Sequence, residues 1–185
     1  MTPMTQTAAS PRRLLLSAVA TMVVALGAGP AMAGAPACSA PEYHQLDFWL
    51  GNWKAYDDDG KGPYVARDEI TTTLAGCVIL EQYRQKDGLD GSGVTIYDAT
   101  RHLWHQTWVT NSGQLLIIEG SFKDGVLTLS GDNLGKDGKR VWYQVSWRQK
   151  TTGTAGVRET AVISRNGGKS WQPAFDILFV RERNG

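Results

Sequence analysis

The sequence predicts an all-β protein, an antiparallel up-and-down β-barrel of about ten strands. From Trp53 to Arg181 the chain consists of short segments rich in Val, Ile, Thr, Tyr and Trp, the residue types that favour strands. Asp-Gly and Asn-Gly pairs such as Asp87-Gly88, Asp124-Gly125 and Asn166-Gly167 separate several of them and suit tight hairpin turns. No segment keeps a helical period over about twelve residues, so the crossover helices of a parallel sheet are not expected. Consecutive hairpins in this number are expected to close into a barrel, because closure removes the exposed edges.

The pattern of strand segments and turns can be followed along the whole chain. A short aromatic lead, Glu42 to Leu50, is expected to be helical or irregular. The expected strands are Trp53–Tyr56, Tyr64–Leu74, Val78–Gln85, Val94–Tyr97, Leu103–Thr110, Leu115–Phe122, Val126–Ser130, Val141–Gln149, Val157–Ser164 and Trp171–Arg181.

Residues 1–33 have the composition of a signal peptide, and residues 34–185 form the predicted β-barrel domain. Arg12-Arg13 precedes the apolar stretch Leu14 to Leu26, and the small-residue pattern Ala31-Met32-Ala33 follows. These are the charged, apolar and cleavage regions of an export signal. The apolar stretch is too short for a membrane-spanning helix, which needs about 20 residues. The two arginines leave a twin-arginine signal open as an alternative. We therefore expect a periplasmic or secreted protein with no membrane span after cleavage.

The two cysteines, Cys38 and Cys77, are predicted to form a disulfide. An even number of cysteines in an exported chain favours pairing over free thiols or metal binding. Closing a loop of about 40 residues would stabilise the fold by about 4 kcal/mol in the chain-entropy model. The bond would tie the N-terminal arm to the connection that follows the first candidate strands.

Charge and motif content exclude several classes of function. After loss of the signal peptide, 17 basic residues face 18 acidic ones, so the chain lacks the basic surface that nucleic acid requires. The three histidines, His44, His102 and His105, do not form a metal-binding pattern, since the last two point to opposite faces of a strand. No catalytic or nucleotide-binding motif is present. No metal, no cofactor and no nucleic-acid partner are predicted, and the oligomeric state is not predicted.

The segment Gly51-Asn52-Trp53, at the start of the first strand, resembles the G-x-W signature of lipocalins and other calycins. That resemblance implies that Trp53 closes one end of the barrel and that an arginine from the last strand, Arg181 or Arg183, lies across its ring. Further segments are similar to a family of uncharacterised, exported bacterial lipocalin-like proteins. They are Asp47–Trp53, Gly76–Glu81, Trp104–Trp108 and Ser164–Trp171.

A more distant similarity is to the ten-stranded nitrobindin barrels, which bind haem through a histidine near the C-terminus. This sequence has no histidine after His105. The haem function therefore does not carry over to it.

The candidate ligand-binding residues are Trp104, Gln106 and Trp108, which alternate along one strand and so share a face. Two indoles flanking an amide would make a suitable wall for a small pocket. Tyr97 and Glu81, on neighbouring strands, are expected to be adjacent to them. The alternative is that these rings only fill the barrel.

Three functions are consistent with the sequence. The first is an exported binding protein for a small apolar or aromatic molecule held in the barrel lumen. The second is a hydrolase or isomerase that uses Glu81 and Glu119 as a lumenal acid–base pair. The third is a packed structural or interaction barrel without a ligand. Binding is favoured over catalysis, because no residue pattern indicates an active site.

Overall fold

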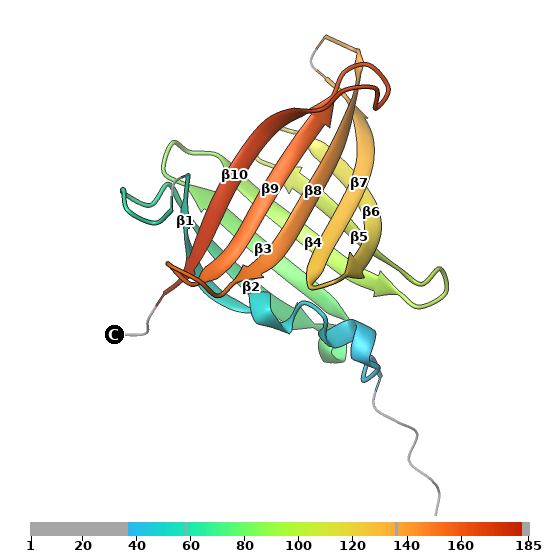
Figure 1. Cartoon of the computed structure of the whole chain (residues 1–185). Helices are drawn as coiled ribbons and strands as arrows, with labels where there is room; N and C mark the ends of the chain where they lie inside the picture. Colours follow the sequence, from blue (N-terminus) through green and yellow to red (C-terminus); the bar gives the residue numbers. More distant parts are fainter. Residues whose placement is uncertain (1–36, 58, 136, 183–185) are drawn as a thin grey trace, which may run out of the picture. The chain divides into compact units, whose positions relative to one another are not determined.

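A computed structural model of the chain describes residues 37–57, 59–135 and 137–182, and the predicted signal peptide lies outside them. The described residues form a closed antiparallel barrel (Figure 1), which confirms the predicted fold class. Its ten strands are β1 (Gly51–Tyr56), β2 (Ala66–Thr73), β3 (Val78–Gln85), β4 (Asp90–Asp98), β5 (Leu103–Thr110), β6 (Leu115–Lys123), β7 (Val126–Leu134), β8 (Arg140–Lys150), β9 (Gly156–Ser164) and β10 (Gln172–Arg181).

Every strand pairs with the next one along the chain, and β1 pairs with β10 to close the barrel. The closing register sets Trp53 opposite Arg181 and Tyr56 opposite Leu178. Side chains alternate between the lumen and the outside, as the period of a strand requires. On β3, for example, Ile79 and Tyr83 face inward and are buried, whereas Gln82 is exposed.

One end of the barrel is filled by the aromatic lead that precedes β1. This lead contains two short 3-10 helices, η1 (Pro41–His44) and η2 (Asp47–Trp49), which lie at the ends of the strands (blue in Figure 1). The Trp49 ring packs 5.4 Å from Trp147 and 5.9 Å from Phe179, centroid to centroid. Burial of these large rings makes this half of the lumen a packed core. We call it the closed end.

Trp53 and Arg181 cover the closed end from β1 and β10. The guanidinium of Arg181 lies 4.3 Å from the centre of the Trp53 ring, and its Nη1 donates a hydrogen bond of 2.8 Å to the carbonyl of Leu50. Gly51 has φ = +131°, and Arg181 Nη1 occupies the space that a Cβ at Gly51 would need. Only glycine fits both the conformation and the close approach, which explains the glycine that precedes Trp53 by two residues.

The predicted Cys38–Cys77 disulfide is present, with the two Cα atoms 5.1 Å apart. Cys77 follows a third short helix, η3 (Leu74–Gly76), between β2 and β3. The bond therefore ties the N-terminal segment to a turn at the closed end.

Candidate functional site

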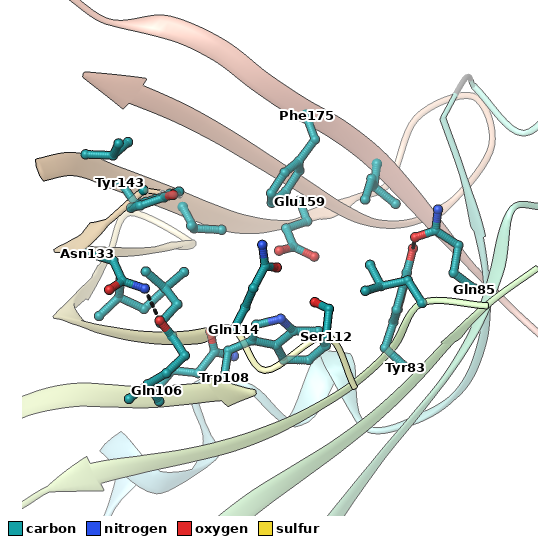
Figure 2. A pocket seen from close by; sticks show the side chains of 18 of the residues that line it. Tyr83, Gln85, Gln106, Trp108, Ser112, Gln114, Asn133, Tyr143, Glu159 and Phe175 are labelled. Atoms are coloured by element: carbon teal, nitrogen blue, oxygen red, sulfur yellow. Dashed lines mark hydrogen bonds between the residues drawn. The ribbon is translucent and has the colours of Figure 1, made fainter. Parts of the chain in front are cut away.

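The other half of the lumen contains a cavity of about 1380 Å³, shown in Figure 2. It extends from Glu81 and Trp147 on the barrel wall to the hairpin loops that carry Ser112, Asp137 and Arg165. Its volume exceeds the several hundred Å³ typical of small-molecule pockets. The barrel is thus packed at the closed end and hollow at the opposite end, which we call the open end.

Aromatic side chains make up much of the cavity wall. Tyr83 of β3 and Trp108 of β5 meet edge to face, with centroids 6.2 Å apart. Aromatic side chains from β8 and β10 also line the cavity: Tyr143, Trp147 and Phe175. Amide side chains stand among them: Gln85, Gln106, Gln114 and Asn133. A few polar groups on an apolar wall are the usual composition of a ligand site.

Two glycines on β4 make room for the Trp108 side chain. A Cβ at Gly91 would overlap the six-membered ring of Trp108, and a Cβ at Gly93 would lie 3.3 Å from Trp108 Cε3. The same Cβ at Gly93 would lie 2.8 Å from Glu81 Oε2. The Trp108 ring and the Glu81 carboxyl group therefore come together over Gly93, and both line the cavity.

Three carboxyl groups face the lumen near the base of the cavity: Asp68 of β2, Glu81 of β3 and Glu159 of β9. Glu81 and Glu159 line the cavity, and Figure 2 shows Glu159 and Trp108 extending into it from opposite walls. Asp68 lies deeper, only 2% exposed, and neither of its oxygens has a hydrogen-bond donor when the neighbouring acids are ionised. Gln106 Nε2 donates a hydrogen bond of 3.4 Å to Glu81 Oε2.

Burial is the main reason that the pKa of each of these three acids is raised. It raises the pKa of Asp68 to about 7 and that of Glu159 to about 8, because an ionised carboxylate loses hydration in the barrel wall. The pKa of Glu81 is raised well above its usual value by burial and by the negative charges of Asp68 and Glu159. A proton held by Glu81 is donated to Asp68. The three acids are therefore expected to retain protons near neutral pH.

The structure separates the sequence-predicted ligand residues into two layers. Gln106, Trp108 and Glu81 line the cavity, whereas Trp104 and Tyr97 do not. Trp104 is 2% exposed, donates to Gln45 Oε1 at 2.9 Å and packs 5.7 Å from Tyr97 in the closed end. Residues four apart on a strand lie about 13 Å apart along its axis, so a shared face does not place them in one pocket.

Asp68, Tyr83, Trp147 and Glu159 belong to the site although the sequence did not single them out. Asp68 does carry a recognisable signal, since it alternates with the apolar residues Ala66 and Ile70 on the inner face of β2. Glu159 gives none, because its neighbours in β9 alternate irregularly between polar and apolar types.

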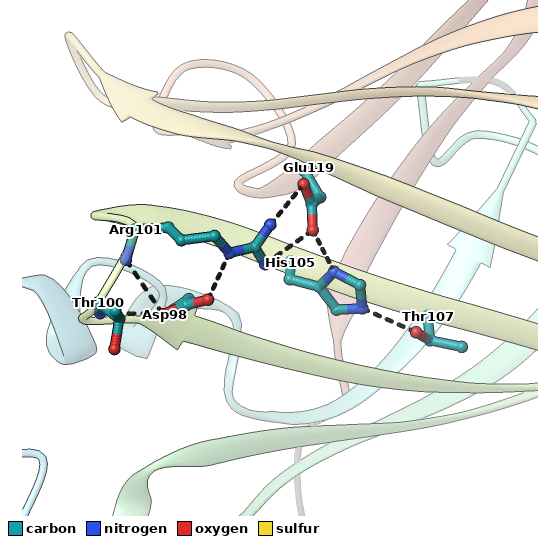
Figure 3. Close-up of polar contacts among 6 residues, drawn as sticks. All are labelled: Asp98, Thr100, Arg101, His105, Thr107 and Glu119. Carbon is teal, nitrogen blue, oxygen red and sulfur yellow. Dashed lines mark hydrogen bonds and ion pairs between the residues drawn. The ribbon is translucent and has the colours of Figure 1, made fainter.

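The predicted pairing of Glu81 with Glu119 is wrong, because Glu119 lies on the outer face of β6. There it accepts hydrogen bonds of 2.9 and 3.0 Å from Arg101, and its Oε1 lies 2.8 Å from His105 Nδ1, as Figure 3 shows. Hydrogen bonds from Arg101 hold the pKa of Glu119 below its usual value. A carboxylate kept ionised outside the barrel cannot act on a molecule inside it.

Comparison of the sequence with protein-family models and with curated proteins finds no match. Within the described part of the chain, no cluster of three or more His, Cys, Asp or Glu side chains is arranged to hold a metal ion. No helix in that part is both long and apolar enough to cross a membrane.

Proposed function

We propose that this protein is an exported lipocalin-like barrel that binds a small apolar or aromatic molecule in its lumen. The observation that carries the proposal is the cavity of about 1380 Å³ with aromatic walls at the open end. A barrel that served only as a packed scaffold would fill this space with side chains, because voids in a core cost stability. Here the cavity remains open beside Trp108, whose ring packs into the space that glycines at positions 91 and 93 leave.

The apolar area that a ligand can bury in the cavity sets an upper limit on its affinity. A ligand that buries about 300 Å² of apolar surface gains about 7 kcal/mol before the cost of association. Such a ligand would bind with micromolar affinity at best, unless polar contacts to Gln106 or Glu81 add to it.

Export is supported by the Cys38–Cys77 disulfide, since such bonds persist mainly in oxidising compartments. We accordingly place the mature protein in the periplasm or outside the cell. The proposed signal peptide, residues 1–33, would direct it there.

Fluorescence titration with N-phenyl-1-naphthylamine, a neutral aromatic probe whose emission rises in apolar sites, tests lumenal binding. We expect saturable binding that Trp108→Ala weakens about ten- to hundredfold, since the substitution removes a large apolar contact. Trp142→Ala is the matched control, because Trp142 lies on the outer face of β8 and is 37% exposed. Equal affinity of the wild type and Trp108→Ala, or no saturable binding by the wild type, would contradict the proposal.

A further inference from the structure

In the described part of the chain, no lumenal cation is positioned to balance the buried acids when they ionise. Among the described residues that line the cavity, Arg165 has the only basic side chain, and it is exposed in the β9–β10 hairpin at the open end. The other titratable side chains that face the three buried acids or line the same cavity are acidic or phenolic. They are Tyr83, Tyr143, Asp57, Asp137 and Asp176.

Asp68 is the strongest sign that a cationic partner is missing. Asp68 is only 2% exposed, neither of its oxygens has a hydrogen-bond partner apart from a proton that Glu81 donates, and its charge acts on both Glu81 and Glu159. Proteins rarely bury a carboxyl group without a hydrogen-bond donor or an opposite charge, because the cost of desolvation is then uncompensated. Protonation compensates the buried charge of the cluster when no cation is bound, and a cation at Glu81 and Glu159 would compensate part of that charge when one is bound.

The cavity wall beside these acids is also suited to a cationic group such as an ammonium. Over Gly93, the Glu81 carboxyl group adjoins the Trp108 ring, and Tyr83 meets that ring edge to face. An ammonium group gains both from a carboxylate and from the face of an indole. The rest of the cavity wall is apolar enough to hold a hydrocarbon or aromatic body.

We propose that the lumenal ligand is an amphiphilic amine, whose protonated nitrogen binds between Glu81 and Glu159 and whose apolar body lies against Trp108. This inference rests on the proposed function and specifies its ligand class. A neutral ligand would need only one or two polar partners, and it would leave the three acids dependent on bound protons. The ammonium balances the charge of one carboxylate and displaces the proton that this carboxylate holds, so binding of the amine releases a proton to solvent.

A matched set of probes separates this inference from lumenal binding in general. The probes are 2-(1-naphthyl)ethylamine, 2-(1-naphthyl)ethanol and 1-naphthylacetate, which share the ring system but carry a positive, a neutral and a negative group. Quenching of tryptophan emission at pH 7.5 measures their affinities. We expect the amine to bind about ten- to hundredfold more tightly than the alcohol, as a charged hydrogen bond allows, and the carboxylate to bind most weakly.

Substitutions then locate the ammonium group. Glu159→Gln should remove most of the preference for the amine and leave the affinity for the alcohol nearly unchanged. Glu81→Gln should have the same effect and serves if Glu159→Gln does not fold. Glu69→Gln is the control, since Glu69 is exposed on the outer face of β2. Calorimetry in buffers of different ionisation enthalpy should show proton release when the amine binds, and affinity should increase with pH between about 6 and 8.

The outcomes distinguish the two proposals. Equal or tighter binding of the alcohol, or an unchanged preference for the amine in both Gln variants, would overturn the amine inference and leave lumenal binding intact. Failure of all three probes at millimolar concentration would overturn both. Amine binding without proton release would also overturn the inference, since the buried acids would then play no part.

Discussion

At the scale of single residues, we expect the buried acids to determine how the stability of this barrel depends on pH. Asp68 has an inward position on β2 between Ala66 and Ile70, two fully buried neighbours. Burial raises its pKa from 3.8 to about 7. In the unfolded chain this carboxyl group is hydrated and returns to its ordinary pKa. The difference links protonation of Asp68 to folding.

The sign of this linkage gives a stability prediction. Between pH 4 and pH 7 the native state holds a proton on Asp68 that the unfolded state has lost, so stability falls as pH rises through that window and levels off above it. We expect Asp68→Asn to reduce the loss of unfolding free energy between pH 5 and pH 8 by about 1–3 kcal/mol. Urea unfolding at the two pH values measures it.

The relevant quantity is the change in unfolding free energy between pH 5 and pH 8, because the amide of Asp68→Asn can itself shift stability at every pH. Glu69→Gln, the neighbouring exposed position, should leave the difference at its wild-type size. If the unfolding free energy of Asp68→Asn changed between pH 5 and pH 8 as much as that of the wild type, Asp68 would not be protonated in the native state.

At the scale of elements, β4 and β5 together shape the cavity. The register sets Gly93 opposite Trp108 and Gly91 opposite Thr110, so the large side chain of β5 lies over the glycines of β4. A larger residue at position 91 would have to displace the indole. The cavity shape therefore depends on both strands: β5 supplies the Trp108 ring, and the glycines of β4 supply the space in which it packs.

Gly91→Ala tests this dependence. We expect a loss of about 1–3 kcal/mol in unfolding free energy, the usual cost of overpacking, together with a shift of tryptophan emission and weaker binding of the naphthyl probes. Val94→Ala on the outer face of β4, where Val94 is 45% exposed, is the control and should change neither emission nor binding. Unchanged probe affinity in Gly91→Ala would mean that the Trp108 position does not shape the site.

At the scale of the whole molecule, the two ends of the barrel differ in structure. The closed end combines the 3-10 helices, the Trp53–Arg181 stack and the disulfide, and it supplies most of the packed core. The open end carries the cavity and the acids. Because the disulfide lies at the closed end, its loss should affect stability much more than binding.

The double substitution Cys38→Ser/Cys77→Ser should lower the unfolding free energy by about 2–4 kcal/mol. Hydrogen exchange should become faster first in residues 38–50, whose N-terminal end the bond anchors, and later in the strands. Affinity for the naphthyl probes should remain within about twofold of the wild type. A large loss of affinity with the strands still protected would show that the two ends are coupled.

For the part of the chain that the structure describes, the sequence by itself determined the number of strands, their order, the disulfide and the absence of long helices. These features follow from local rules: side-chain alternation, turn residues and the pairing of two cysteines in a chain with a predicted export signal. The boundaries were less accurate at β4, which begins at Asp90 rather than at Val94. Gly91 and Gly93 have low strand propensity, and only the need for space beside Trp108 explains them.

Only the tertiary structure decided which inward residues share a site. Leu115, Leu116, Ile117 and Ile118 make both faces of β6 apolar, so alternation could not show that Glu119 faces outward. Trp104 and Trp108 share one face, and the closure of the barrel by a distant segment, residues 41–49, places Trp104 in the core and leaves Trp108 at the cavity. Likewise, Glu81 and Glu159 are 78 residues apart in the sequence, and they face one cavity because β1 pairs with β10 and closes the sheet on itself.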